Sequence, residues 1–221
     1  MTDALNKFRN KYPRQGLIFY KMDVANKNGL EAAYSEIFKN FGSIDIVVNI
    51  AGMFNELDVM RTITVNLGGV INSTLAAMKY MGVENDGKGG IIANMSSVVG
   101  LDPNFMMPTY CATKHGIVGF TRSLSDEFYW KKTGIKFVTL CVGVTITPML
   151  TNFPEKLLYS EMEEGSYRLL ELADKQSASD VSKCIMSILE KCENGEVFIV
   201  ENKKFFPIKM DSYWKMNKGG K

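Results

Sequence analysis

The chain has 221 residues, of which 46% are hydrophobic and 23% charged, and this length suits one domain with a substantial core. Its 26 basic and 24 acidic residues leave a net charge of +2 without a long run of either sign, which argues against nucleic acid or an anionic membrane as the main partner. Since no apolar stretch approaches about 18 residues and the first residues lack a signal-peptide core, we expect a cytoplasmic protein without a membrane span.

Strand-like and helix-like segments alternate along the chain. Most of the strand-like runs are continuously apolar, as in parallel strands that are covered on both faces, and they lie at residues 17–24, 44–49, 90–95, 135–142 and 196–200. Helices are predicted near residues 28–41, 56–82, 109–133 and 178–192. This alternation predicts an α/β fold with right-handed crossovers, in a single domain that spans residues 1–221.

Three segments have the composition of connections. Residues 84–90 form a polar, glycine-rich loop before the third strand. Residues 149–175 mix charged and aromatic side chains without a clean period, which predicts either a mobile lid over a substrate pocket or a pair of surface helices. Residues 215–221 are basic and contain glycine, and they predict a disordered tail.

The cysteine and methionine content narrows the chemistry. No Cys-x-x-Cys pair occurs and His115 is the single histidine, so we expect buried thiols and no metal site. The 14 methionines indicate an adaptable apolar interior, either as ordinary core filling or for a lipid-like substrate. The four cysteines are Cys111, Cys141, Cys184 and Cys192.

The residues best suited to chemistry are Tyr110 and Lys114, with Ser97 thirteen positions before the tyrosine. Residues four apart share one face of a helix. A neighbouring ammonium favours the phenolate form of a tyrosine, which predicts a lowered pKa for Tyr110 and suits proton transfer. A serine hydroxyl beside the phenol can hold an alcohol or carbonyl oxygen. The spacing alone also occurs on solvated helix faces, so the flanking segments decide its meaning.

Four ordered segments resemble the short-chain dehydrogenase/reductase family. They are Asn-Ile-Ala-Gly at residues 49–52, Thr-Val-Asn-Leu at 64–67, Asn-Met-Ser-Ser-Val-Val-Gly at 94–100, and Pro-Thr-Tyr-Cys-Ala-Thr-Lys-His-Gly at 108–116. The resemblance implies a Rossmann-like, doubly wound parallel sheet and an oxidoreductase. The implied reaction transfers a hydride between a hydrophobic secondary alcohol (prostaglandin-like, another lipid or aliphatic) and NAD.

The same resemblance implies roles for individual residues. Tyr110 would be the general base, and Lys114 would lower its pKa and bind the nicotinamide ribose. Ser97 would orient the reacting oxygen, with Ser96 as the competing candidate. Asn66 would hold a water in a proton relay, with a plain helix asparagine as the alternative. The substrate residues would be Ser97, Tyr110 and Met107, the last in place of a polar partner in the NAD-dependent branch, which favours an apolar alcohol.

Cofactor contacts carry over in the same way. Asp23 would lie near the adenine ring, unless it only caps a turn, and Gly52 near the ribose, unless it serves a tight turn. The segment 141–147 resembles the family's loop near the nicotinamide, with a valine in place of its proline. The residues expected at NAD are Asp23, Val24, Asn49, Ala51, Gly52, Tyr110, Lys114, Gly143, Thr145 and Thr147.

The sequence also departs from the family. No Gly-x-x-x-Gly-x-Gly loop follows the first strand-like run, and the family's first two strands and first helix have no counterpart. We therefore expect an N-terminally incomplete domain with a separated segment 17–24 and an apolar edge at residues 44–49. Besides an enzyme that dimerises through helices 56–82 and 109–133, the alternatives are a catalytically silent subunit that binds other copies, and a lipid carrier.

Overall fold

A five-stranded sheet of order β1-β2-β3-β6-β7 forms the centre of the molecule. Strands β1, β2, β3 and β6 run parallel, and β7 pairs antiparallel with β6. The structure is a computed structural model that describes residues 2–11 and 16–211. The strands of the sheet are Ile46–Asn49 (β1), Gly90–Ser97 (β2), Ile135–Val142 (β3), Val197–Glu201 (β6) and Lys204–Ile208 (β7). A second sheet pairs Thr145–Ile146 (β4) with Gln176–Ser177 (β5).

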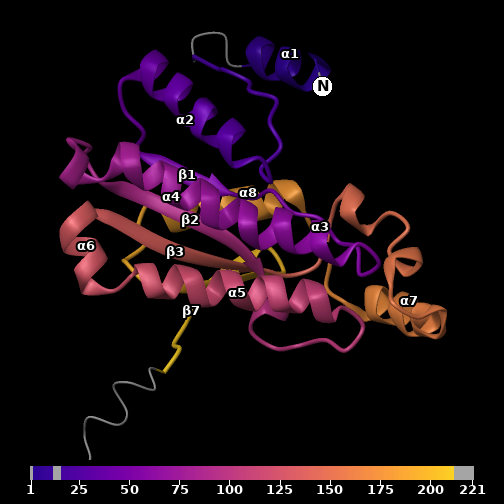
Figure 1. The fold of residues 1–221 in the computed structure, drawn as a ribbon. Coiled ribbons are helices and arrows are strands. Elements are labelled where there is room, and N and C mark those ends of the chain that lie inside the picture. Colours follow the sequence, from indigo (N-terminus) through magenta and orange to yellow (C-terminus); the bar gives the residue numbers. More distant parts are fainter. Residues whose placement is uncertain (1, 12–15, 212–221) are drawn as a thin grey trace, which may run out of the picture.

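Helices lie on both faces of the sheet (Figure 1). Their ends follow local capping rules: Asn26 caps α2 at its N-terminus, Gly42 ends it in the left-handed conformation, and Ser177 and Asp180 form a capping box on α8. The α-helices are Thr2–Lys11 (α1), Lys27–Phe41 (α2), Val59–Ile63 (α3), Gly69–Met81 (α4), Pro108–Leu124 (α5), Glu127–Thr133 (α6), Glu163–Leu172 (α7) and Ala178–Leu189 (α8).

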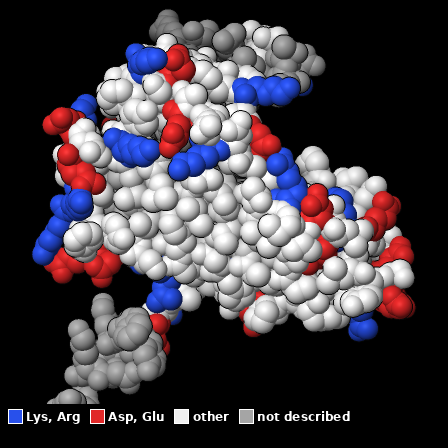
Figure 2. All heavy atoms as spheres, viewed as in Figure 1, with Lys and Arg blue, Asp and Glu red and all other residues white. Residues whose placement is uncertain are grey.

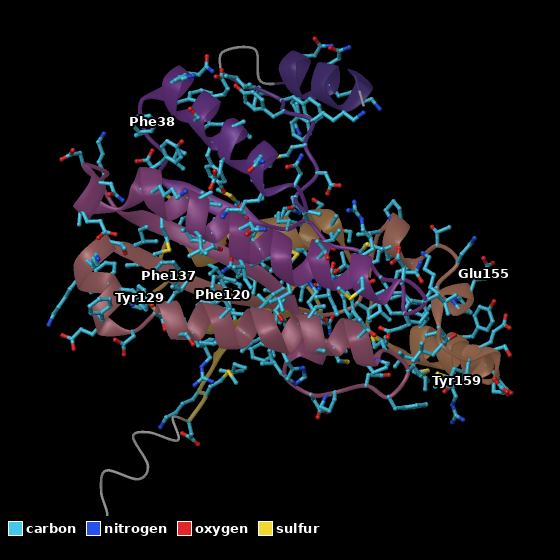
Figure 3. The ribbon with its side chains drawn as sticks, viewed as in Figure 1. Phe38, Phe120, Tyr129, Phe137, Glu155 and Tyr159 are labelled. Carbon is cyan, nitrogen blue, oxygen red and sulfur yellow. The ribbon has the colours of Figure 1, made fainter. Side chains whose placement is uncertain are left out.

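Two apolar clusters hold these layers together. On one face of the sheet, side chains of α2 and α4 pack with those of β2 and β3, and Phe137 is fully buried there. Phe120 of α5 and Tyr129 of α6 point toward Phe137 (Figure 3). On the other face, α8 packs against β3 and β6. Because successive residues of β3 alternate between these clusters, the strand is buried on both faces, as its continuous apolar sequence predicts.

The predicted α/β class and the doubly wound parallel sheet are confirmed, and so are four of the strand-like runs. The predicted helix at 109–133 is divided, because α5 ends at Leu124 and Asp126 starts a new helix by accepting the Phe128 N–H at 2.9 Å. The predicted helix at 56–82 begins only at Val59 and contains a π-helical turn, Thr64–Gly68 (η1). Strand β7 was not predicted, because its sequence contains a proline and a charged residue, which are typical of an edge strand.

The prediction of a strand at residues 17–24 is wrong. This segment has no regular secondary structure and turns at Asp23, whose carbonyl accepts the Asn26 N–H at 2.9 Å. An apolar run becomes a strand only where a neighbour pairs with its backbone, and β1 pairs with β2 alone among the strands that the structure describes. Apolar side chains are exposed both on segment 17–24, at Phe19 and Met22, and on β1, at Ile46. The apolar edge expected at this place is therefore present.

Other predictions concern the ends of the chain and its setting. The predicted disordered tail, residues 215–221, lies outside the described residues. Within residues 2–11 and 16–211, no helix is long and apolar enough to cross a membrane. The cytoplasmic location stays a prediction.

Candidate active site

The carboxyl ends of three neighbouring parallel strands lie along one edge of the sheet. β1 ends at Asn49, β2 at Ser97 and β3 at Val142, and Ser97 is the register partner of Val142. Segments that leave such strands meet at this edge, which is where α/β folds of this kind place ligands. The predicted catalytic and cofactor residues lie on these segments and on the helices that follow them.

Tyr110 lies in the first turn of α5 and is enclosed by apolar side chains. Its ring meets that of Phe54 edge-on at a centroid distance of 5.6 Å, and its hydroxyl donates to the Sδ of Met149 at 4.0 Å. Burial raises the pKa of the Tyr110 phenol above its usual value, and the neighbouring Cys111 thiol adds to the rise. The expected lowering of this pKa is therefore absent, since the loss of hydration favours the neutral phenol.

Lys114 lies one helical turn after Tyr110, as the spacing predicts. Its Nζ is 5.4 Å from the centroid of the tyrosine ring and donates to the backbone oxygen of Met95 on β2 at 3.1 Å. Burial lowers the pKa of Lys114 to about 8. An ammonium has three donors, and Met95 is the one acceptor that this group has among the described residues. Two donors therefore remain for a polar ligand.

The two serines at the end of β2 differ in their surroundings. The Ser96 hydroxyl is buried and donates to the backbone oxygen of Lys114 at 2.9 Å, so it joins β2 to α5. The Ser97 hydroxyl accepts only the weak Val99 N–H bond at 3.4 Å, and no hydrogen bond in the described part of the chain joins it to Tyr110. Val99 packs in the same apolar cluster as Tyr110. These contacts favour Ser97 over Ser96 as the hydroxyl that meets a ligand.

Asn66 is fully buried in the π-helical turn η1 and takes part in a closed set of hydrogen bonds. Its Oδ1 accepts the Met53 N–H at 2.8 Å, and its Nδ2 donates to the Met53 backbone oxygen at 2.8 Å and to Thr113 Oγ1 at 3.3 Å. A Cβ built on Gly52 would lie 3.4 Å from Asn66 Oδ1 and 3.9 Å from Lys114 Nζ. Asn66 and Lys114 thus converge on the backbone of Gly52.

The residues predicted near the adenosine of a dinucleotide, apart from Gly52, line two hollows, one beside α2 and one beside β1. Asp23 lies on the wall of one of about 340 Å³, whereas Val24, Asn49 and Ala51 line another of about 260 Å³. Met22 lines both hollows, so they adjoin. Asp23 accepts the Ala25 N–H and pairs with Arg61 at 2.8 Å, and these contacts lower the pKa of its exposed carboxyl. The turn-capping alternative for Asp23 is therefore compatible with its geometry.

The loop after β3 carries the residues predicted near the nicotinamide. The Gly143 N–H donates to the Val200 backbone oxygen at 3.0 Å, and a side chain at Gly143 would collide with Glu201. Thr145 donates to the backbone oxygen of Gly143 at 3.0 Å, and Thr147 precedes the short helical turn Pro148–Leu150. This loop leads from the sheet edge directly to Met149, which covers Tyr110.

A cover segment, defined here as residues 148–172, closes the site on its outer side. It consists of three single helical turns and α7, so the predicted helix pair is wrong. The mobility of this segment stays a prediction. Glu155 and Tyr159 lie on the outer part of this segment, away from the sheet (Figure 3). Met107, the third predicted substrate residue, is buried under it with Phe153 and Leu157. The wall beside Tyr110 is therefore apolar.

Three residues at the site carry no signal in the sequence. Met149 covers the phenol, Arg61 holds Asp23, and Glu56 binds the first turn of α5. Each contact joins segments that are far apart in the chain, and each residue type is common on solvated surfaces or in cores.

A phenol, an ammonium and a hydroxyl gathered where parallel strands end suit proton exchange with an alcohol or ketone oxygen, which defines the class as an α/β oxidoreductase. A family profile described as "short chain dehydrogenase" matches residues 1–158. The chain belongs to this family, as the four sequence segments predict.

Relatives with known names are similar over most of the chain. Alcohol dehydrogenase 1 of Ceratitis capitata is 32% identical over 212 residues, which cover 96% of this chain and 82% of the fly protein. 15-Hydroxyprostaglandin dehydrogenase [NAD(+)] of Mus musculus is 38% identical over 168 residues, which cover 76% of this chain and 60% of the mouse protein. Both names are those of dehydrogenases, which agrees with the oxidoreductase class that the four sequence segments imply. The crystal structure of levodione reductase superposes with a TM-score of 0.77 at 21% identity, over 90% of this chain and 81% of that one, and shows the shared fold.

Proposed function

We propose that this oxidoreductase converts an apolar secondary alcohol to a ketone, with NAD as the cofactor. The observation that carries the proposal is the shared enclosure of Tyr110 and Lys114 on one face of α5, beside the end of β2. The names of the fly and mouse relatives, one of which includes NAD(+), support the reaction class and the cofactor.

Each catalytic residue has one task in the proposed reaction. The Ser97 hydroxyl donates to the substrate oxygen and orients it, and Tyr110 accepts the hydroxyl proton. Lys114 stabilises the phenolate form of Tyr110 that takes up this proton, since its ammonium lies 5.4 Å from the centroid of the ring. Bound NAD would supply the hydride acceptor. Asn66 holds the backbone of Met53 in place beside the site through two hydrogen bonds.

The residues present fit one half of the dinucleotide. The two free donors of Lys114 suit ribose hydroxyls, and the absence of a side chain at Gly52 leaves room beside them. The hollows lined by Asp23, Asn49 and Ala51 suit the adenosine. For the pyrophosphate, the described residues offer no glycine-rich turn between a strand and a helix N-terminus. We therefore expect weak NAD binding by this chain.

The substrate class follows from the wall beside Tyr110. Met107, Met149, Phe54 and Phe153 offer an apolar surface, and within the described residues Met149 Sδ is the one acceptor that the phenol meets. A hydrophobic alcohol, either prostaglandin-like or aliphatic, fits this surface better than a sugar alcohol.

The experiment compares Tyr110→Phe with the parent chain. Removal of the phenol oxygen should lower kcat by about 10²–10⁴-fold, the range for a lost general base, and leave the Kd for NADH nearly unchanged. Tyr167→Phe, at an exposed tyrosine on α7, is the matched control and should keep the parent kcat. Turnover of Tyr110→Phe near the parent level would refute the role of this residue.

A second candidate is a catalytically silent subunit that pairs with other copies, and the surface supports the pairing. Figure 2 shows few charged side chains over α4 and α5. Leu75 on α4 is exposed. We propose that this face forms a homodimer in either case. The two candidates separate in a fluorescence titration with NADH, since a silent subunit gives no saturable signal.

A further inference from the structure

Glu56 is a buried carboxylate whose partners are the backbone of α5. The residue lies in the loop between β1 and α3 and is fully buried. Its Oε2 accepts the Thr109 N–H at 2.9 Å, and its Oε1 accepts the Tyr110 N–H at 2.8 Å. None of the salt bridges within residues 2–11 and 16–211 includes Glu56. The carboxylate therefore serves the helix and not a basic side chain.

The first turn of α5 needs such a partner. A helix leaves its first N–H groups without acceptors, and a side chain at the N-cap usually supplies one. Here the N-cap is Met107, which makes no side-chain cap bond, and Pro108 has no N–H. The Cys111 N–H is bonded to the Met107 backbone oxygen at 2.8 Å. Glu56 thus takes both remaining donors, and its charge is favoured by the helix dipole.

The cap of α5 differs from those of other helices because it comes from a distant segment. Asn26, Asp126 and Ser177 cap their helices from the adjoining residue, whereas Glu56 precedes its two partners by 53 and 54 positions. A local cap suffices to stabilise a helix end. A distant cap also fixes where that end lies relative to another part of the molecule.

The loop that carries Glu56 also holds the cover segment. The Glu56 N–H donates to the Lys156 backbone oxygen at 2.9 Å. Phe54 stacks on Phe153 of the cover at 4.5 Å between centroids and meets the Tyr110 ring edge-on at 5.6 Å. Residues 54–56 therefore contact the cover on one side and the Tyr110 turn on the other.

We propose that Glu56 is a positioning residue for Tyr110, which fixes the first turn of α5 against the loop and the cover. It acts through the backbone N–H of the tyrosine and does not touch the substrate. This inference rests on the proposed function, in which the phenol must reach the substrate oxygen held by Ser97. A displacement of about 1 Å at such a site can cost about 10²-fold in rate.

Glu56→Gln tests the inference with little change in size. The amide keeps one acceptor oxygen, but its NH₂ group cannot accept, so either Thr109 or Tyr110 loses its partner. We expect kcat per folded molecule to fall by about 10- to 100-fold, with the Kd for NADH changed less than about twofold. Glu56→Asp keeps both acceptor oxygens on a shorter side chain, so its kcat should lie between those of the parent and Glu56→Gln. It replaces Glu56→Gln in the comparison if that variant does not fold.

Asp126→Ala is the control for a cap with a purely structural role. It removes the bond to the Phe128 N–H at the start of α6 and should lower the unfolding midpoint without changing kcat. If Glu56 also acts only on stability, Glu56→Gln will lower the unfolding midpoint as Asp126→Ala does and keep the parent kcat per folded molecule. That result would overturn the inference.

A readout without turnover separates this inference from the proposed function. Amide hydrogen exchange at Thr109 and Tyr110 should be slow in the parent and at least about tenfold faster in Glu56→Gln, since a lost bond exposes the N–H. Asp126→Ala should leave both rates unchanged. If the parent turns over no alcohol, the proposed function fails while the exchange rates still test the role of Glu56. Equal rates in the parent and Glu56→Gln would reject that role.

Discussion

Lys114 brings an amino group into a part of the molecule that contains mostly apolar side chains. Its pKa is about 8, lowered from 10.5 by burial. The proposed stabilisation of a Tyr110 phenolate needs the ammonium form, which predominates below pH 8. A high pH favours deprotonation of the buried phenol, but it also removes the proton of Lys114. The two groups therefore set the pH range of activity together.

Stability should depend on pH through Lys114. Between pH 8 and 10.5 the unfolded chain binds more protons at this residue than the folded chain, so the unfolding free energy rises with pH. The rise is about 3 kcal/mol over the interval, since one pKa unit corresponds to about 1.4 kcal/mol. Lys114→Met removes this contribution. Urea denaturation should show a parent-minus-variant difference that grows with pH, and a constant or falling difference would contradict the prediction.

The arrangement of Tyr110 and Lys114 could be predicted from sequence because helix geometry alone places residues four apart on one face. The direction of the Tyr110 pKa shift could not, since Phe54 and Met149, which enclose the phenol, come from other segments. Glu56 was missed for the same reason. In the sequence it stands among polar residues of a loop, and only the fold brings it to the start of α5.

At the scale of elements, the π-helical turn η1 depends on Asn66. The side chain satisfies both backbone groups of Met53 at a partly buried place, and these groups have no other hydrogen-bond partner within the described residues. Asn66→Ala should lower the unfolding free energy by about 3 kcal/mol, because an unsatisfied buried group costs about 1–3 kcal/mol. Asn66→Asp should also destabilise, since a carboxylate cannot donate to the Met53 oxygen.

The control for Asn66 is a nearby asparagine. Asn72 on α4 makes no side-chain hydrogen bond in the described part of the chain, so Asn72→Ala should leave stability equal or higher, as alanine favours helix. Chemical denaturation of the three variants measures this. If Asn66→Ala and Asn72→Ala unfold at the same midpoint, the bonds to Met53 do not hold the turn.

Elements with strong local signals were predictable, and those set by tertiary pairing were not. α8 and β3 have clear periodicity or a continuous apolar run with end signals, and their predicted positions agree with the structure. Residues 17–24 have the composition of a strand but lack a neighbour, whereas β7 has a poor strand composition and pairs with β6. Backbone pairing decided both cases.

For the whole molecule, the proposed dimer face makes a prediction about assembly. Leu75→Glu adds a charge to the exposed surface of α4, where charged side chains are few, and should convert the parent dimer to monomer, since a buried unpaired charge is costly. Leu172→Glu, at a more exposed leucine on α7, should leave the dimer intact. Sedimentation velocity measures both variants. A dimer that survives Leu75→Glu would place the contact on another face, and a monomeric parent would reject the dimer.

β1 is an edge strand, so a further strand could pair with its open side and extend the sheet. Among the described residues, the outer backbone groups of Ile46–Asn49 have no neighbouring strand to pair with. A synthetic extended peptide, supplied separately, could dock there in trans and complete the row. The edge of β1 would then be a binding site for a second polypeptide. The concentration of that polypeptide would determine what fraction of molecules has a complete nucleotide site.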